Sequence, residues 1–104
     1  MDFRIIVDPS AESDLADHFE IIAKDSFDHA CHWVETAWTK IFSLREMPTR
    51  FALIDESRVL GEPLRSILHY SHRIVYKVDK ASNTVEILRV WHQARRDIRP
   101  SDLN

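Results

Sequence analysis

The chain has 104 residues and a net charge of −3 when its six histidines are neutral. This length fits one domain, residues 1–104, and a hydrophobic share of 44% is enough to build a core. No apolar run approaches the ~20 residues of a membrane span, which excludes a membrane protein built on such helices. One cysteine, Cys31, excludes an intramolecular disulfide and is typical of a reducing compartment, so we expect a cytoplasmic protein.

Charge is distributed unevenly along the chain. Residues 1–63 carry 6 Lys and Arg against 13 Asp and Glu, a balance of −7, whereas residues 64–100 carry 8 against 3, a balance of +5. A basic surface on an acidic protein suggests an anionic partner that meets one face. The alternative is that these cations only solvate an exposed sheet edge.

The chain opens with a short β-strand followed by a helix. Residues 3–7 are rich in β-branched side chains, and Asp8-Pro9 ends the strand. Ser10 stands where a helix N-cap belongs. Apolar residues at helical spacing then predict an amphipathic helix that reaches about Lys24.

A second helix follows almost at once. Asp25-Ser26 interrupts the first helical pattern and offers another N-cap. Apolar spacing from Phe27 to about Arg45 predicts a helix of about five turns, which Met47-Pro48 stops. A join of two residues predicts an antiparallel helical hairpin.

The second half of the chain reads as a sheet. Residues 48–62 are polar and irregular, and three strands follow over 63–69, 72–79 and 84–92. Short polar connections predict an antiparallel meander, with Asn83 tolerating a left-handed backbone in the second turn. The last strand is apolar on both faces, which is typical of a central strand. The order β-α-α-β-β-β predicts an α+β fold with a helical hairpin on one face of a twisted sheet.

Three segments carry a pattern that resembles the ParE/RelE family of type II toxin–antitoxin toxins. The first helix opens with Pro9-Ser10-Ala11-Glu12-Ser13-Asp14-Leu15, similar to the family's P-x-A-x-x-D-L. The strands supply Arg65, His72-Arg73-Ile74-Val75-Tyr76-Lys77-Val78 and Ile87-Leu88-Arg89-Val90-Trp91-His92-Gln93-Ala94-Arg95-Arg96. These match the family's R-x-L, Y-R-I-x-Y-x-V and I-L-R-V-x-H-x-x-R in the right order. The resemblance covers nearly the whole chain and implies the family's fold.

The resemblance is closer to the ParE branch. RelE members, which cleave ribosome-bound mRNA, are generally very basic and often end in a catalytic tyrosine, whereas this chain has no tyrosine after Tyr76. A ParE-like chain implies a growth-inhibiting toxin of a plasmid stabilisation system that poisons DNA gyrase and is neutralised by a ParD-like antitoxin. Operator DNA would be reached only through the antitoxin. A third hypothesis is an interaction partner of the same fold that has lost toxicity.

The ribonuclease alternative assigns three catalytic residues. His92 would act as the acid or base near neutral pH, and Arg73 and Arg95 would hold phosphate oxygens. Tyr76 is excluded because strand alternation places it on the face opposite Arg73. The structural alternative is that the arginines pair with antitoxin or with nearby acidic residues, namely Asp79, Glu86 and Asp97.

The binding hypothesis uses an overlapping set of residues. Trp38 fits the apolar stripe of the second helix, whereas Trp33 falls beside it, where an aromatic can anchor a partner. Trp91 either anchors a partner or packs with its indole N–H satisfied at the rim. The predicted partner-binding residues are Arg65, Arg73, Arg89, Trp91, Arg96 and Trp33.

A metal site is the remaining possibility near the start of the second helix. His29 and His32 lie one turn apart, which is a ligand spacing, and three further polar residues lie close in sequence, Asp25, Asp28 and Cys31. Acidic residues at a helix start favour the helix dipole without any metal. Because a clear set of four ligands is lacking, we predict neither a metal nor a cofactor.

Overall fold

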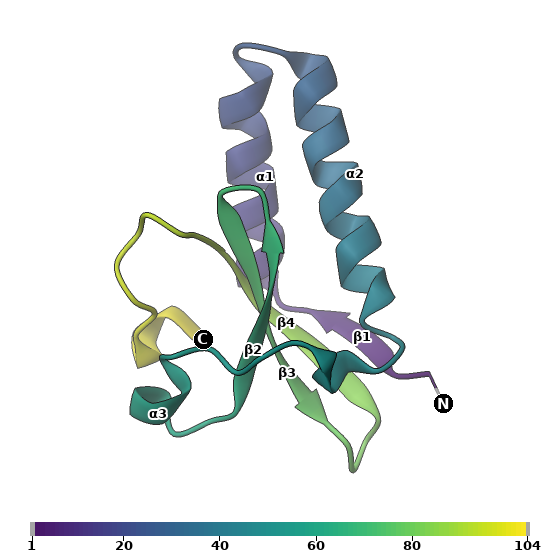
Figure 1. Cartoon of the computed structure of the whole chain (residues 1–104). Helices are drawn as coiled ribbons and strands as arrows, with labels where there is room; N and C mark the ends of the chain where they lie inside the picture. The colour runs from purple at the N-terminus through teal and green to yellow at the C-terminus, as the bar shows by residue number, and fades with distance from the viewer. Residues whose placement is uncertain (1, 104) are drawn as a thin grey trace.

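The computed structural model describes residues 2–103 and confirms the predicted order of elements. Strand β1 is followed by helices α1 and α2, a short helix α3, and strands β2, β3 and β4 (Figure 1). Turns of 3₁₀ helix lie before α3 and at the C-terminal end, at Pro48–Arg50 and Pro100–Leu103. The bounds are β1 Arg4–Val7, α1 Pro9–Ala23, α2 Phe27–Ser43, α3 Ser57–Leu60, β2 Leu64–His69, β3 His72–Asp79 and β4 Thr84–His92. Within residues 2–103, no helix is long and apolar enough to cross a membrane.

The four strands form one mixed sheet in the order β1-β4-β3-β2. The last three strands make the predicted antiparallel meander, and β1 adds in parallel to β4, pairing Arg4 with Thr84. This makes β4 a central strand, as its two apolar faces predicted. The sequence did not predict the position of β1. On the side of β4 away from β3, β1 pairs only with the first half of the strand, residues 84–87.

A bulge in β4 decides which side chains share a face. Val75 pairs with Arg89 but Tyr76 pairs with Ile87, so Leu88 is an extra residue in the ladder. Before the bulge, Val85 and Ile87 face the helices, and after it Val90 does. Because Leu88 is an extra residue, the alternation of side chains between the two faces of the sheet is shifted by one position after it. Simple alternation along the sequence therefore assigns residues 89–92 to the wrong face.

Two apolar clusters lie on opposite faces of the sheet. The larger one joins the helical hairpin to the sheet and includes Leu15, Ile41, Ile74 and Ile87. The smaller one is covered by α3 and the C-terminal segment, which lie side by side in Figure 1. Its members are Ile54, Leu64, Val75, Leu88, Trp91 and Ile98. The sheet is therefore buried on both faces around β4.

The helical hairpin differs from its prediction at the first cap. Helix α1 begins at Pro9 and not after Ser10, because proline is favoured at the first helical position, where no amide is needed. The N-cap is Asp8, whose side chain makes no capping bond. At α2 the predicted cap is confirmed: the Ser26 hydroxyl accepts a hydrogen bond from the His29 amide at 3.2 Å.

Replacing Ser26 with alanine is expected to lower the free energy of unfolding by about 1 kcal/mol, because the α2 terminus loses its side-chain acceptor. Urea denaturation would measure the change. Ser13→Ala is the matched control, since Ser13 is exposed within α1 and caps nothing, and its effect should stay within about 0.5 kcal/mol. Equal effects of the two substitutions would contradict the capping role.

Candidate functional site

The residues predicted to act together fall on opposite faces of the sheet. In the β3–β4 ladder Arg73 pairs with Trp91, and the next pair is His72 with His92. Neighbouring residues of a strand point to opposite faces. Arg73 and Trp91 therefore face the smaller apolar cluster, whereas His92 faces the helices, where its ring lies 6.5 Å from that of His18 in α1.

Trp91 is the centre of a cluster of cations. Its side chain is buried, and its indole N–H donates to the carbonyl of Arg96 at 2.8 Å. The guanidinium carbons of Arg95, Arg89 and Arg96 lie 3.8, 5.0 and 5.6 Å from its ring centroid. Such contacts favour a cation over the ring face. We call Trp91 with these three arginines the Trp91 cluster.

Arg73 is held by a buried carboxylate. Both of its terminal nitrogens donate to Glu56, whose residue is 6% exposed and also accepts from the amide of Ile98 at 3.1 Å. These hydrogen bonds, from Arg73 above all, lower the pKa of Glu56 to about 2. The guanidinium is therefore committed to a contact that joins β3 to α3 and to the C-terminal segment.

Arg89 is held by a carboxylate in a similar way, in the part of β4 that β1 does not pair with. Its Nε and Nη2 donate to the two carboxylate oxygens of Asp14 in α1, at 2.8 and 2.7 Å. The Val90 amide donates to the same carboxylate at 2.9 Å. Asp14 thus supplies a hydrogen-bond acceptor for the amide of Val90, which lies in the part of β4 beyond its pairing with β1. The hydrogen bonds to Asp14 raise the pKa of Arg89.

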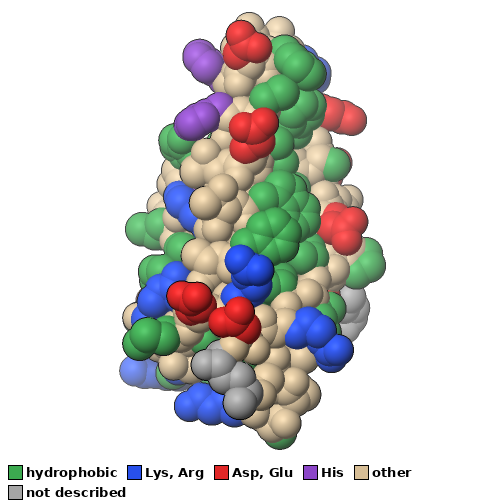
Figure 2. Space-filling view, turned by 90° about the vertical axis from the view of Figure 1, so that its right-hand side faces the viewer, with side chains coloured by type: hydrophobic (Ala, Val, Ile, Leu, Met, Phe, Trp, Pro, Cys, Tyr) green, Lys and Arg blue, Asp and Glu red, His purple; other side chains and the backbone are tan. Residues whose placement is uncertain are grey.

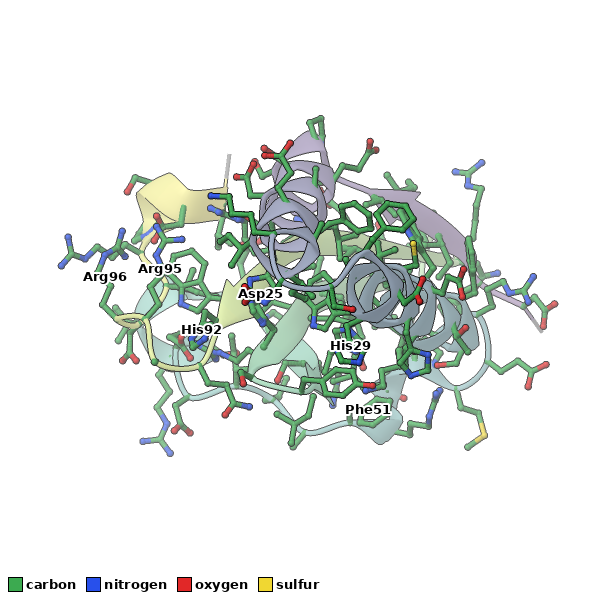
Figure 3. All side chains as sticks on the ribbon, turned by 90° about the horizontal axis from the view of Figure 1, so that it is seen from above. Asp25, His29, Phe51, His92, Arg95 and Arg96 are labelled. Carbon is green, nitrogen blue, oxygen red and sulfur yellow. The ribbon has the colours of Figure 1, made fainter. Side chains whose placement is uncertain are left out.

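The other cations of this half of the chain differ in how firmly they are held. Arg96 is ion-paired to Asp102 at 2.8 Å, and Arg65 donates to the carbonyls of Thr49 and Phe51. Arg95 is exposed, and among residues 2–103 its guanidinium makes no hydrogen bond or ion pair. Arg95 and Arg96 lie at the outer edge of the molecule, beside the C-terminal segment (Figure 3). Arg95 is therefore the cation of the Trp91 cluster best placed to meet a partner.

A second cluster, of imidazole rings, lies on the helix side of the sheet. The ring of His72 lies 4.2 Å from that of His18 and 4.8 Å from that of His92. Trp33 packs beside this group, 4.7 Å from His18, and its carbonyl accepts from Nε2 of His69 at 2.9 Å. In His92, Nδ1 accepts from the Ala94 amide, which leaves Nε2 as its protonated nitrogen when neutral.

Burial lowers the pKa of both His69 and His72 to about 4, and the neighbouring histidines and Lys40 act in the same direction. Burial and His92 also lower the pKa of His18. His18, His69 and His72 are therefore neutral at pH 7. A general acid of ordinary pKa cannot be supplied by His69 or His72.

These lowered pKa values predict a pH-dependent stability. Between pH 6.5 and 4 the unfolded chain binds protons that the folded chain does not. The free energy of unfolding is therefore unaffected above pH 6.5 and decreases as the pH is lowered below 6.5. From pH 7 to pH 5 we expect a loss of about 2 kcal/mol for each of His69 and His72. Urea denaturation at the two pH values measures it, and His72→Gln should remove part of the slope while the exposed His29→Gln should not. Equal slopes in both variants and the unchanged chain would contradict the assignment.

The structure separates the three residues of the ribonuclease hypothesis. Arg95 stacks on Trp91 and Arg73 pairs with Glu56, both on the face opposite His92. The structure therefore does not bring His92 together with the two arginines, because the extra residue at Leu88 changes which face of the sheet the following β4 side chains occupy. Tyr76, as predicted, lies on the face opposite Arg73, and its hydroxyl donates to the carbonyl of Pro48.

The two tryptophans predicted as possible partner anchors, Trp33 and Trp91, are both buried. Trp33 is 6% exposed and belongs to the core, whereas Trp38, which fitted the core stripe, is half-buried and stacks on Phe42. The sequence spacing misplaced Trp33 beside the core stripe, whereas Trp38 packs against the larger apolar cluster as its spacing predicts. Trp33 lies in the core because the β2–β3 hairpin covers that side of α2, bringing His69 to its ring.

The acidic partners of the arginines were not identified from the sequence. Asp79, Glu86 and Asp97 had been named, but the carboxylates that pair with Arg73, Arg89 and Arg96 are those of Glu56, Asp14 and Asp102. One signal was available, because Asp14 is the acidic position of the P-x-A-x-x-D-L pattern. Glu56 had none, since it lies in an irregular segment. Within residues 2–103, no group of three or more His, Cys, Asp or Glu side chains could hold a metal ion.

Comparison with known proteins gives one family and several similar folds. The model of a family described as the ParE toxin of the type II toxin–antitoxin system, parDE, matches residues 5–97. The chain is similar to a solved structure of a chromosomal ParDE system from P. aeruginosa, with a TM-score of 0.69 and 16% identity over 86% of this chain and 95% of that one. It is also similar to one from the RelBE2 toxin–antitoxin complex of Mycobacterium tuberculosis, with a TM-score of 0.55 and 24% identity over 88% and 99%. None of the curated proteins matches the chain.

Proposed function

The chain belongs to the ParE toxin family of type II toxin–antitoxin systems, and from this premise we propose that it acts by binding DNA gyrase and is neutralised by a ParD-like antitoxin. In this proposal the protein inhibits growth by a protein–protein contact in the cytoplasm and contributes to plasmid stabilisation. It carries no cofactor, and it reaches operator DNA only through the antitoxin.

The observation that carries the proposal is the separation of His92 from Arg73 and Arg95 by the sheet. Metal-free RNA cleavage needs an acid, a base and cations around a single phosphate. In this chain the histidines beside His92, His18 and His72, are neutral at pH 7. Arg73 and Arg95 lie on the opposite face of the sheet. A binding toxin needs no such convergence.

Arg95 is the residue through which we expect target binding to act. Its guanidinium is fixed over the Trp91 ring at 3.8 Å but keeps its hydrogen-bond donors for a partner, an arrangement that limits the entropy lost on binding. Arg96 and Arg65 lie at or near the surface and complete the proposed contact set. Arg73, Arg89, Trp91 and Trp33 would support that surface from inside the fold.

Expression of the chain alone in bacteria is expected to arrest growth, and co-expression of the short open reading frame next to its gene should restore growth. Arg95→Ala is expected to relieve the arrest with only a small change in the thermal midpoint, because the side chain loses an exposed cation–π contact with Trp91 worth about 0.5–1 kcal/mol. Arg58→Ala, an exposed arginine in α3, is the matched control and should stay toxic. Unimpaired growth on expression of the unchanged chain would support a non-toxic interaction partner in place of the toxin.

A further inference from the structure

The β2–β3 turn, residues 70–71, rests against helix α2 through two polar contacts. Nε2 of His69 donates to the carbonyl of Trp33 at 2.9 Å, and Nζ of Lys40 donates to the carbonyl of Leu68 at 3.0 Å. The turn closes the hairpin that carries β2, an edge strand of the sheet, and it rises beside the helical hairpin (Figure 1). These two bonds tie the turn to α2.

Trp33 is the side chain that the turn covers. Its ring centroid lies 4.9 Å from that of His69 and 5.4 Å from that of His72, the two residues that flank the turn. His18 of α1 approaches the same ring to 4.7 Å. Imidazoles from α1, β2 and β3 thus meet at one tryptophan of α2, which is buried beneath them.

Both histidines that flank the turn carry a buried nitrogen without a partner among residues 2–103. In His69 the Trp33 carbonyl can only accept, so the proton of the neutral ring is on Nε2 and Nδ1 is bare. Nδ1 of His72 is likewise buried and makes no hydrogen bond. Protonation places an N–H on each of these nitrogens, and a buried donor without an acceptor is costly.

Other cations and imidazoles face these two rings from every neighbouring element. Lys40 of α2 acts on His69, and His18 of α1 acts on both His69 and His72. His92 of β4 adds to the effect on His72. A positive charge gained by either ring is therefore repelled by its neighbours.

One carboxylate acts in the opposite direction. The charge of Asp14 in α1 favours the protonated form of His72. The oxygens of Asp14 already accept hydrogen bonds from Arg89 and from the Val90 amide. Asp14 is therefore committed to β4 and supplies no acceptor to the buried nitrogens beside Trp33.

The contact between the turn and the tip of the helical hairpin is incomplete. A hollow of about 240 Å³ lies between them, lined by Ile22, His29, His32, Trp33 and Tyr70. The two histidines of α2 in this lining are exposed, and histidine side chains stand out on the upper part of the α2 side of the molecule (Figure 2). The turn can therefore move away from α2 without breaking close packing along its whole length.

We propose that residues 69–72, the β2–β3 turn with its two flanking histidines, form a proton-operated flap: protonation of His69 and His72 releases it from the helical hairpin and uncovers Trp33, while the rest of the sheet stays folded. In the open position both imidazolium rings reach water, which offers acceptors to all of their N–H groups. Only protons are taken up in this step. The flap depends on the cluster around Trp33 alone, so it is independent of the proposed target and antitoxin.

Opening the flap costs far fewer contacts than unfolding the chain. It breaks the two bonds to α2 and the bond from the Gln93 amide to the Ser71 carbonyl, which is 2.8 Å long. Ile41, Ile74 and Ile87 stay packed between the helices and the sheet. Local opening of this kind has a smaller free energy than global unfolding, so protonation drives it first.

Proton linkage sets the size of the effect. The pKa of each flap histidine is lowered to about 4 in the closed position, by burial above all, and returns to its ordinary value of 6.5 in water. The closed position is therefore fully favoured above pH 6.5 and is weakened as the pH falls toward 4. Between pH 7 and pH 5 the equilibrium constant for opening should rise about 20-fold for each ring and roughly 400-fold for both.

Hydrogen exchange of the Gln93 amide measures the opening of the flap, because the acceptor of this amide is the Ser71 carbonyl. After correction for the intrinsic exchange rate at each pH, its opening constant should rise roughly 400-fold from pH 7 to pH 5. A local opening exposes little surface, so exchange of Gln93 should hardly depend on urea below the unfolding transition. Exchange of the Asp8 amide, which is bound to Ile87 of β4, should increase steeply with urea.

Matched pairs of substitutions identify the protons. His69→Gln with His72→Gln keeps an N–H donor at each position but removes both titrating groups, and the rise for Gln93 should fall below about threefold. His29→Gln with His32→Gln changes two exposed histidines that face the same hollow and should leave the full rise. Each single substitution in the flap should leave a rise of about 20-fold, which gives the same test where the double variant does not fold.

An equal rise in the two double variants would overturn the proposal, because the protons would then bind elsewhere. Equal dependence of the Gln93 and Asp8 amides on urea would overturn it as well, because the turn would then open only when the whole chain unfolds. Neither result bears on toxin activity, which the growth and supercoiling assays test separately.

Discussion

Replacing Asp14 with alanine is expected to lower the free energy of unfolding by about 3–5 kcal/mol, one of the two largest losses that the structure predicts. The carboxylate accepts from Arg89 through two nitrogens and from the Val90 amide, and both charged side chains are about 15% exposed. Its removal leaves the Val90 amide without its acceptor and the Arg89 guanidinium with only the Asp102 carbonyl, at 2.9 Å, inside the α1–β4 contact. Denaturant unfolding at pH 7 measures the loss.

Two controls distinguish this contact from a general effect of charge. Asp17→Ala removes an exposed carboxylate from the same helix and should change stability by less than about 0.5 kcal/mol. The double variant Asp14→Leu with Arg89→Met should be more stable than Asp14→Ala, because no buried charge is left unpaired. A double variant less stable than Asp14→Ala would show that the ion pair is not the reason for the loss.

Glu56→Ala is expected to cost a similar amount, about 3–5 kcal/mol, and to loosen the C-terminal segment. Glu56 is the common acceptor of Arg73 and of the Ile98 amide, and Ile98 packs in the smaller apolar cluster with Trp91. Without the carboxylate the segment after β4 loses its polar anchor. Denaturant unfolding measures the total loss, and faster hydrogen exchange at the Ile98 amide reports the local one.

The pKa of Glu56 adds a second readout. Because it falls from 4.5 to about 2 on folding, its contribution to stability is complete above pH 4.5 and is lost as the pH falls toward 2. The Glu56→Ala variant should therefore show a shallower loss of stability over this range. Glu62→Ala, a half-exposed partner of Lys77, serves as the control and should keep the full slope. Identical slopes for the two variants would contradict the anchoring role.

Much of the fold follows from local features of the chain. The turn at Asn83 adopts the left-handed backbone that the sequence indicated, with a φ of 51°, and Ser26 caps α2. Periodicity over 9–43 was enough for the helical hairpin, and strand patterns over 72–79 and 84–92 matched the observed bounds. These features depend on neighbours within a few residues, which is why sequence patterns capture them.

The features that were not predicted depend on contacts between distant segments. The bulge at Leu88 directly follows Ile87, the last residue of β4 that pairs with β1, and nothing in the local sequence marks it. Tyr70 adopts a φ of 54° in the β2–β3 turn, a position where glycine or asparagine is more usual. Its ring lies beside Lys40 and His69, so tertiary contacts accompany the unfavourable backbone.

The candidate site shows the same division. The sequence indicated that arginines gather in the last strands. Three of them lie near Trp91, and a fourth, Arg73, pairs with Glu56 at the start of α3. Their partners lie 75 residues away for Arg89 and 17 residues away for Arg73, so the pattern could not distinguish cations that hold the fold from cations that face a partner. Only the three-dimensional arrangement shows that Arg95, unlike the ion-paired Arg89 and Arg96, is an exposed member of the Trp91 cluster with no hydrogen bond or ion pair among residues 2–103.

The most direct test compares two activities of the purified chain in parallel. One reaction measures DNA supercoiling by gyrase, and the other measures cleavage of mRNA on translating ribosomes. We expect that the chain inhibits supercoiling, that Arg95→Ala weakens this inhibition, and that mRNA stays intact. Cleavage of mRNA that His92→Ala abolishes, with supercoiling unaffected, would contradict this expectation.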